Sequence, residues 1–534
     1  MLHRPFQFIG FLAIVVVALA VVVSACQSPA TPTAVAPTVA PAAPTAAEPS
    51  PTPRPKATGK MVIALTAEPE DMDPVQESST TRPITRNILE RLTDRDAKTM
   101  ELTGLLAEKW EQTSPTAWRF QLRKSIRFHN GEKFNAEAAA WNINRAFDKE
   151  LNSRLRIYLG PELKAQALDE NTLEVVTESP DPMLPYRLYF VPIAAAKQAQ
   201  NIPEELSNKP LGTGPYRHFE WSRGQFYRIT ANDEYWGPMP KIKDVTYVWR
   251  KESAVRASMV KTGEADMAFN ISADDVKTVP KYVSHPTVET AMVRMDTENP
   301  ALKDKRVRLA INLAIDKKSL VDRMYAGFAD VARGQIINSL VVGYNPALQP
   351  YPYDPDQAKK LVGEAKAAGV PVDKELDYWL WKGWWPRDDE VAEAVASMLK
   401  EVGINAKLNI VEQARWRDVF YAVAPGQPRG ALLQQAHGNE MGDSSQSTGL
   451  LLRCGGRAAM MCDKRLDEMD DKARIATGEE RAKLYRDVWK YLNEEVVPVA
   501  PLFQLRFIYG LSQRLNWEPR VDGLVQIKEM SLSE

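Results

Sequence analysis

The stretch LLAEKWEQTSPTAWRFQLRKSIRFHNGEKFNAEAAAWNINRAF, from Leu105 to Phe147, predicts a strand, a turn and a helix in that order. Apolar residues alternate with polar ones from Trp118 to Leu122, as they do in a strand that buries one face. A turn is indicated at His129-Asn130-Gly131, because glycine adopts a positive φ freely. Asn135 can cap the helix that follows, and Glu137 would lie in its positively polarised first turn.

The same stretch contains a series of residues in a particular order, namely Leu106, Ala107, Trp110, Trp118, Arg119, Phe120, Leu122, Arg123, Phe128, Gly131, Phe134, Ala136 and Glu137. In this series the chain resembles the solute-binding proteins of ABC importers, in the class that includes oligopeptide- and dipeptide-binding proteins. Ala138 departs from the pattern, since the family often has a second acidic residue there. The resemblance implies an α/β, periplasmic-binding-protein-like fold of class II, whose two lobes close on a ligand. It implies the three-domain version, with a discontinuous first domain.

Further short motifs extend the resemblance from Met61 to the C-terminus. They are Asn87–Leu92, Gly212–Tyr216, Asn232–Trp236, Thr262–Met267, Asp304–Ile311 and Tyr353–Leu361. The resemblance implies that domain I comprises residues 61–100, 212–299 and 506–534, domain II residues 101–211, and domain III residues 300–505.

The composition excludes some classes of protein. The 534 residues carry 68 Lys and Arg against 69 Asp and Glu, without a basic run, so nucleic-acid binding is not expected.

The sequence contains no HExxH, GxSxG or P-loop pattern, and we expect no catalytic residues, metal site or cofactor. Gly442-Asp443-Ser444 resembles the start of some hydrolase sites. However, no His follows it, so a polar loop is the better interpretation.

The N-terminus has the features of a secretory signal. Arg4 precedes an apolar run from Phe8 to Val23, and small residues lead to Cys26. This ending resembles the bacterial lipobox, which implies a signal peptide over 1–25 and a lipid on Cys26. A membrane-spanning anchor is the alternative. Residues 26–60 are rich in Ala, Pro and Thr, and we expect a disordered tether there. The protein would then lie at the outer face of the bacterial cytoplasmic membrane.

Two cysteines remain, Cys454 and Cys462. Their spacing matches no zinc motif, and outside the cytoplasm an isolated pair favours a disulfide over two buried thiols.

Three groups of residues are candidates for ligand contact. Ser79, Thr80 and Thr81 precede a predicted helix, in a loop that lies near the ligand in relatives; the alternative is a solvated helix entry. Trp379, Trp381, Trp384 and Trp385 lie within seven positions and favour a stacking surface for a ligand. Packing in the core is the alternative for these tryptophans. Trp416 matches a position that contacts peptide in relatives.

The segment after Trp416 departs from the peptide-binding branch of the family. That branch has an aspartate that pairs with the α-amino group of the ligand, and Leu433–Glu440 has no aspartate at the matching place. Glu440 and Asp443 are the carboxylates that could replace it, although their spacing differs. Gln434 and His437 are further candidates for ligand contact and would suit a neutral polar solute.

Together these features predict an extracytoplasmic, lipid-anchored and monomeric solute-binding protein. It would deliver a peptide or another polar solute to an ABC permease with its ATPase. An oligosaccharide-binding importer component, a ligand-sensing receptor and a secreted hydrolase are the alternatives.

Overall fold

The computed structural model describes residues 56–160, 162–201, 203–421 and 431–533. The expected signal peptide, Cys26 and the tether up to residue 55 lie outside these ranges. The first strand, β1 (Thr58–Leu65), begins inside the segment expected to be disordered, so that expectation is wrong for residues 58–60. The backbone of Thr58 and Lys60 pairs with β10, while their side chains are exposed; the polar composition therefore gave no sign of the strand. In the described part of the chain, no helix combines the length and the apolar character that a membrane span requires.

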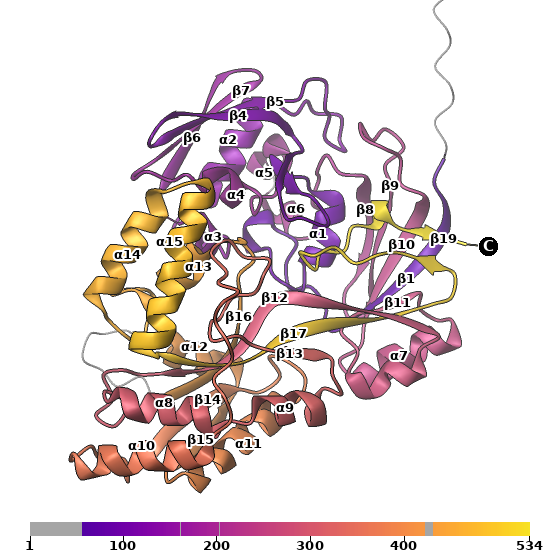
Figure 1. Ribbon diagram of the computed structural model, residues 1–534. Helices are drawn as coiled ribbons and strands as arrows, with labels where there is room; N and C mark the ends of the chain where they lie inside the picture. Colours follow the sequence, from indigo (N-terminus) through magenta and orange to yellow (C-terminus); the bar gives the residue numbers. More distant parts are fainter. Residues whose placement is uncertain (1–55, 161, 202, 422–430, 534) are drawn as a thin grey trace, which may run out of the picture. The chain divides into compact units, whose positions relative to one another are not determined.

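A mixed sheet of eleven strands forms the framework (Figure 1). Its order is β15 (Ala406–Val411), β14 (Leu376–Trp381), β16 (Leu432–Gly438), β12 (Lys281–Met295), β17 (Val499–Leu511), β11 (Met267–Ala268), β1, β10 (Ile242–Trp249), β9 (Phe226–Ala231) and β8 (Tyr216–Ser222), with β13 (Ala329–Val331) paired to β17.

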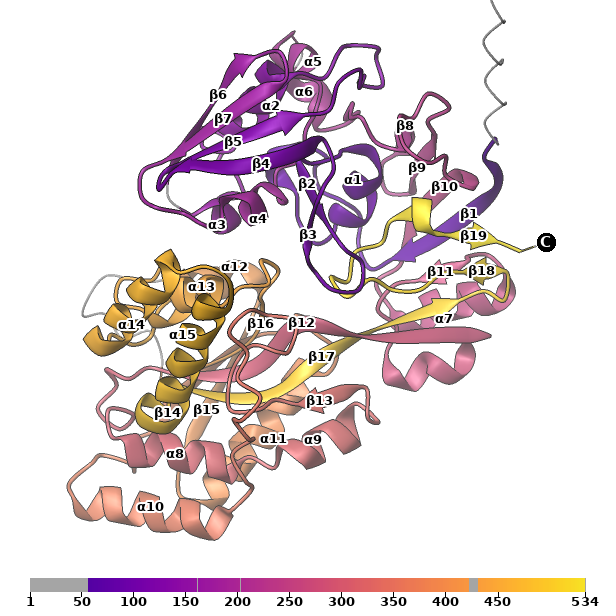
Figure 2. The ribbon, with the colours of Figure 1, turned by 45° about the horizontal axis from the view of Figure 1, so that its top comes forward.

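The long strands β12 and β17 connect the two lobes of the fold (Figure 2). Their first pairing runs from Lys281↔Leu511 to Pro286↔Arg506, beside β11, and their second lies beside β16 and β13. Between Pro286 and Thr290 the register shifts, so the ladder is interrupted where the lobes join. We call β13–β16 with the helices α8 to α15 the second lobe, and the remaining described elements outside β12 and β17 the first lobe.

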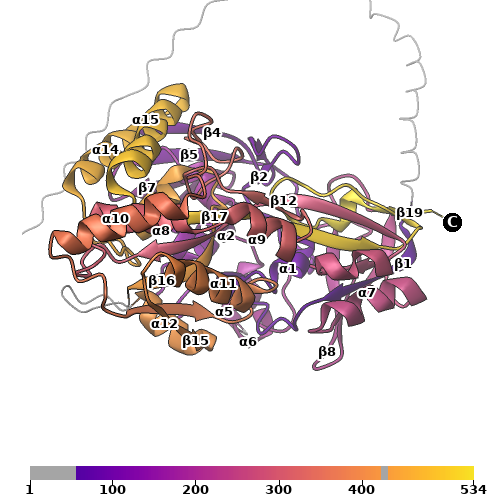
Figure 3. The same ribbon diagram turned by 60° about the horizontal axis from the view of Figure 1, so that its bottom comes forward.

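Helices cover both faces of the sheet in the second lobe (Figures 1 and 3). Their bounds are α8 (Lys305–Ala314), α9 (Lys317–Met324), α10 (Pro355–Ala367), α11 (Asp388–Glu401), α12 (Gln413–Tyr421), α13 (Ser444–Ser447), α14 (Lys464–Ile475) and α15 (Gly478–Tyr491). One core contains Val307 of α8 and Val395 of α11 with Ala291, Val293 and Met295 of β12. On the opposite face Met292 packs in a separate core with Trp489 of α15. Alternate residues of β12 thus point to opposite faces of the sheet and contribute to both cores.

The first lobe contains a four-stranded antiparallel sheet in the order β4 (Ala107–Ser114), β5 (Ala117–Leu122), β7 (Thr172–Thr177), β6 (Leu163–Asp169). The expected strand, turn and helix are present. Phe120 and Leu122 of β5 are buried, Gly131 has φ 85°, and Asn135 caps α2 (Ala136–Arg145) by accepting from the Ala138 amide. The helix packs its alanine side on this sheet, because small side chains allow close approach.

The remaining helices of the first lobe are short, apart from α7. They are α1 (Arg82–Ile88), α3 (Arg156–Leu159), α4 (Leu184–Leu188), α5 (Ala196–Asn201), α6 (Pro203–Leu206) and α7 (Ser253–Thr262). Two small ladders complete the lobe, β2 (Thr93–Arg95) with β3 (Leu102–Gly104), and β18 (Leu515–Asn516) with β19 (Ser531–Leu532).

Cys454 and Cys462 form a disulfide, with an S–S distance of 2.10 Å. The loop that it closes reaches into the second lobe: Ala458 is fully buried, and its carbonyl oxygen accepts from the guanidinium of Arg294 on β12. The bridge therefore holds a loop that supplies a partner to a buried arginine.

Candidate functional site

The tryptophans of the 378–386 segment lie mainly among core side chains. Trp385 is 6% exposed and belongs to the core beneath α8 and α11. Trp381, Trp384 and Trp416 form a row of ring contacts, with centroids 5.2 Å and 6.1 Å apart. Trp416 is itself 3% exposed. The half-buried Trp379 packs on the same core. This arrangement favours the packing interpretation of the tryptophan cluster.

Gln434 lies inside the second lobe. It is 1% exposed; its amide oxygen accepts from the Tyr378 hydroxyl at 2.6 Å, and its amide nitrogen donates to the Asp388 carbonyl at 2.7 Å. Both ends of the side chain are satisfied within the protein, so its position does not support a ligand contact.

His437 is 6% exposed, and its Nε2 lies 2.9 Å from the Ser447 hydroxyl. Burial lowers the pKa of His437 to about 4, so the ring is neutral at pH 7. Asn439 donates to the same hydroxyl at 2.8 Å. His437 thus holds α13 against the end of β16.

The loop before α1 bonds largely to itself. The Thr81 hydroxyl accepts from the Ser78 amide, and the Ser78 and Thr80 hydroxyls lie 2.9 Å apart. Thr81 is buried, Thr80 is half-buried and Ser79 is exposed. Of the three candidates, Ser79 and Thr80 therefore keep accessible side chains.

Directly after this loop, the structure brings Glu440, a candidate from the sequence, into contact with first-lobe residues that the sequence did not single out. Arg82 donates to the Tyr158 hydroxyl at 3.3 Å, and that hydroxyl donates to a carboxylate oxygen of Glu440 in the second lobe at 3.4 Å. Arg95, at the end of β2, donates to the carbonyl oxygens of Glu440 and Met441. The segment 438–443, which begins at the last residue of β16, is thus one part of the second lobe that contacts the first.

Most buried carboxylates around this contact form a salt bridge with an arginine. Glu77 is paired with Arg91 and Arg82. Burial alone would raise the pKa of Glu77, but Arg91, Arg86 and Arg82 lower it to about 2. Asp443, one of the two carboxylates considered for a ligand amine, is fully buried, caps α13 and is bound by Arg481 through two contacts of 2.7 Å. Asp443 therefore serves the structure.

Glu289 and Glu440 differ from these residues. Within the described ranges no hydrogen bond or ion pair to the Glu289 carboxylate is seen, and Glu440 accepts only from neutral groups, Tyr158 and Gln446. Burial and the charge of Glu440 raise the pKa of Glu289 to about 7, with Arg82 opposing. No sequence pattern pointed to Glu289, because only the pairing of β12 with β16 brings it near Glu440.

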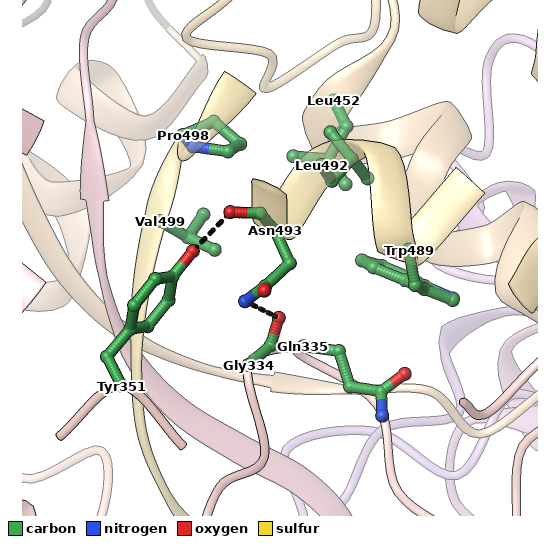
Figure 4. A pocket seen from close by; sticks show the side chains of 9 residues that line it. All are labelled: Gly334, Gln335, Tyr351, Leu452, Trp489, Leu492, Asn493, Pro498 and Val499. Atoms are coloured by element: carbon green, nitrogen blue, oxygen red, sulfur yellow. Dashed lines mark hydrogen bonds between the residues drawn. The ribbon is translucent and has the colours of Figure 1, made fainter. Parts of the chain in front are cut away.

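Two cavities lie away from this contact. The first, of about 10 Å³, is lined by Tyr351, Trp489 and Asn493 among others (Figure 4). It has room for about one water molecule. The second, of about 80 Å³, lies beside Thr213, His129 and Trp236 in the first lobe. It has room for a few waters, and neither cavity would hold a peptide. In the described residues, no group of three or more His, Cys, Asp or Glu side chains is placed to hold a metal ion.

Comparison with known families decides the class of this protein. Residues 101–453 match the model of the bacterial extracellular solute-binding proteins, family 5 (middle). The chain belongs to this family. A probable di/tripeptide-binding protein 5 of Pseudomonas aeruginosa is 27% identical to this family member over 488 residues, which cover 83% of this chain and 90% of the relative. The glutathione-binding protein GsiB of Escherichia coli O157:H7 is 27% identical, over 67% of this chain and 70% of its own.

Solved structures confirm the expected fold. The ABC transporter substrate-binding protein CtaP of Listeria monocytogenes has a TM-score of 0.78 at 18% identity, covering 90% of this chain and 100% of its own. DppA of Helicobacter pylori, in complex with the peptide STSA, has a TM-score of 0.73 at 22% identity, with coverage of 89% and 98%. The family 5 chain therefore has the two-lobed α/β fold of periplasmic binding proteins.

Proposed function

We propose that this protein is the extracytoplasmic solute-binding component of an ABC importer. It captures a peptide or another polar solute between its lobes and delivers it to a permease with its ATPase. The observation that carries this proposal is the family match over residues 101–453. The names of the relatives, which bind di- and tripeptides or glutathione, favour a short peptide or a peptide-like solute. The proposed role requires binding and no chemical step on the ligand.

The proposed mechanism follows from how the lobes are joined. Domain I would comprise residues 61–100, 212–299 and 506–534, domain II residues 101–211, and domain III residues 300–505. Closure would bend β12 and β17 near the interruption between Pro286 and Thr290. The contacts that the 438–443 segment makes with Arg95 and Tyr158 would hold the lobes closed over the solute.

A thermal-shift screen tests the proposal. Peptides, oligosaccharides, amines and metal chelates are added to the purified chain, and a ligand at 100 times its dissociation constant should stabilise it by about 2.7 kcal/mol. Mass spectrometry of the same mixtures should find every probe intact. Turnover of a probe would favour a secreted hydrolase, and a screen without any stabilising probe would count against solute binding.

The oligosaccharide alternative depended on the tryptophan cluster, and the burial of Trp385 and Trp416 weakens it.

A receptor that senses the same solute would differ from an importer component because the cell would not need it to take up the solute. Deleting the gene should abolish uptake of the identified radiolabelled solute if the protein serves import, and should leave uptake intact if it serves sensing.

We further propose that Cys26 carries the lipid that anchors a monomeric protein to the outer face of the cytoplasmic membrane. The Ala-, Pro- and Thr-rich segment from residue 27 to about 57 would be the tether. Metabolic labelling with a palmitate analogue should label the wild-type chain and not Cys26→Ser, which should leave the membrane fraction. Equal labelling of both would refute the anchor.

A further inference from the structure

Met441 carries an apolar side chain from the second lobe into the first. It follows shortly after β16, where α3 of the first lobe lies beside α13 of the second (Figures 1 and 2). Its side chain is 2% exposed and belongs to a buried apolar cluster. The other buried members of this cluster come from the first lobe and are Tyr158, Met183, Tyr189 and Phe190. Met441 is thus packed among side chains of the opposite lobe.

Polar groups fix Met441 from both lobes. In the first lobe, Nη1 of Arg187 lies 3.7 Å from the Met441 sulfur, and Arg95 donates to the Met441 carbonyl at 3.0 Å. In the second lobe, the Met441 amide donates to the side-chain oxygen of Gln446 at 2.9 Å. The position of the thioether in the first-lobe cluster is therefore well defined.

The burial of this sulfur depends on contact between the lobes. Met267 and Met292 are fully buried as well, but each lies in a core that belongs to one lobe and the long strands. Separation of the lobes leaves those two sulfurs covered and withdraws Met441 from its cluster. Access of a solvent-borne reagent to the Met441 sulfur therefore reports whether the lobes are apart.

The reagent class that acts on a thioether is a peroxide. One peroxide oxygen is transferred to the sulfur: the O–O bond breaks, an S–O bond forms, and the other oxygen leaves as water. The sulfur is oxidised by two electrons and the peroxide is reduced, so the methionine becomes a sulfoxide.

The sulfoxide would not fit where the thioether lies. Its additional oxygen needs space between tightly packed rings, since Tyr158 and Phe190 stack with centroids 4.1 Å apart. It also brings a polar group into an apolar cluster. Nη1 of Arg187 already donates to the Tyr158 carbonyl at 3.0 Å, and its Nε to Asp181 at 2.7 Å, so Arg187 is poorly placed to compensate.

We propose that Met441 is a redox-sensitive latch: its thioether holds the lobes together, and its oxidation by a peroxide while they are apart prevents them from closing again. A solute that keeps the lobes closed protects the sulfur. The inference concerns the contact between the lobes and goes beyond the proposed function, because it holds whichever solute is bound.

The first test measures access to the sulfur. The full mature chain is treated with hydrogen peroxide, and each oxidised methionine is located by peptide mass mapping. Arg95→Leu removes an interlobe donor, so Met441 should be oxidised roughly tenfold faster in this variant than in the wild type. The rate at Met292 should stay the same. Equal rates at Met441 in the two proteins, or equal acceleration at Met292, overturn the proposal.

The second test measures the consequence by small-angle scattering. Oxidation of the wild type should increase the radius of gyration by on the order of 1 Å. Met441→Leu keeps an apolar side chain without sulfur and should show no increase. Met441→Gln is polar, like the sulfoxide, and should show the larger radius without peroxide. Circular dichroism of each variant checks that the fold is retained.

Two further comparisons assign the effect to Met441. Met469→Leu replaces a half-buried methionine of α14 and should respond to peroxide as the wild type does. Met441→Leu still contains Met183 and Met100, whose methyl carbon lies 3.6 Å from a Cβ atom built on Gly442. An increase in radius of Met441→Leu on oxidation would assign the effect to these residues and overturn the latch. A wild type whose radius is unchanged after complete oxidation of Met441 would overturn it as well.

Discussion

Glu90 joins three separate sequence motifs through one buried carboxylate. It accepts hydrogen bonds from the Thr213 hydroxyl at 2.8 Å, the Tyr235 hydroxyl at 2.7 Å and the Trp236 indole at 2.8 Å. Burial raises the pKa of Glu90, and these three donors oppose that rise. Glu90 therefore fixes the 212–216 and 232–236 segments to the end of α1.

Replacing Glu90 should destabilise the protein strongly. Glu90→Ala leaves three donors without an acceptor, and we expect a loss of about 3 kcal/mol in the free energy of unfolding. Thr213→Val removes one donor only and should cost about 1 kcal/mol. Chemical denaturation of both variants measures the difference, and equal losses would contradict the shared role of this carboxylate.

Glu289 should make stability depend on pH. Its pKa in the folded protein, about 7, exceeds its ordinary value of 4.5. Protonation of Glu289 thus stabilises the folded state fully below pH 4.5, and this stabilisation is lost as the pH rises through 7. Glu289→Gln should therefore be more stable than the wild type at pH 8, on the order of 1–3 kcal/mol, and similar to it at pH 4.5.

Unfolding with urea at both pH values measures this difference, with the exposed Glu364→Gln as control. A destabilised Glu289→Gln at pH 8 would show that the carboxylate has a stabilising partner.

At the scale of secondary-structure elements, the loop before β8 approaches the end of α1 closely. A Cβ atom at Gly212 would lie 2.1 Å from the Ile88 carbonyl oxygen, and one at Gly214 would lie 2.6 Å from the same atom. The glycines of the 212–216 motif are therefore required by close backbone approach. The helix α1, which follows the Ser79–Thr81 loop as expected, ends at Ile88, because Glu90 forms a β-bridge with Ile193.

Gly212→Ala should destabilise the fold by about 3 kcal/mol, since rigid backbone cannot yield to the new methyl group. Gly363→Ala is the matched control. Gly363 lies inside α10 with no atom within 4 Å of the added Cβ, and alanine should stabilise that helix by about 0.5–1 kcal/mol. Thermal unfolding of the two variants should shift in opposite directions.

The disulfide should stabilise the second lobe by about 2–3 kcal/mol, because it closes a short loop. The double variant Cys454→Ser/Cys462→Ser should unfold at a correspondingly lower urea concentration. Reducing agent should lower the unfolding midpoint of the wild type and leave the double variant unchanged. A wild type insensitive to reduction would contradict this contribution.

For the complete fold, the connection between the lobes is the main structural feature. β17 runs without a break through the expected boundary between residues 505 and 506, so both lobes share it. The contacts across the interface include both polar bonds and apolar packing, because Met441 of the second lobe belongs to a buried cluster with Tyr158 and Phe190 of the first. Arg95 is central to them, since it donates to the Glu440 and Met441 carbonyls and lies over the Tyr189 ring.

Arg95→Met should let the lobes separate in the absence of ligand. We expect the radius of gyration from small-angle scattering to increase by on the order of 1 Å, from about 23 Å for a compact body of this length. Arg119→Met, at an exposed position of β5, serves as control. An unchanged radius would show that Arg95 does not hold the lobes together.

Local patterns predicted much of the fold. Alternation identified β5, and Asn135 caps α2 as its place in the sequence indicated. Such signals involve residues close in sequence, and they act within a single strand or turn. The family resemblance added the order in which these units assemble.

The site was less predictable. Gln434 and the tryptophans are residue types that suit a ligand, yet burial assigns Gln434, Trp385 and Trp416 to the core. The sequence analysis missed Arg82, Tyr158 and Glu289, because no sequence pattern around these residues marks them as functional.

The amino-acid sequence by itself determined the class of the protein, its strands and helices, and its candidate anchor, since these depend on short-range patterns and on family motifs. The folded arrangement determined which polar groups are satisfied and which are not. Glu289 and Glu440 lie 151 positions apart, and only the β12–β16 pairing brings two carboxylates together without an arginine of their own. Charge balance depends on which residues are close in space, so neither segment of the sequence alone could predict it.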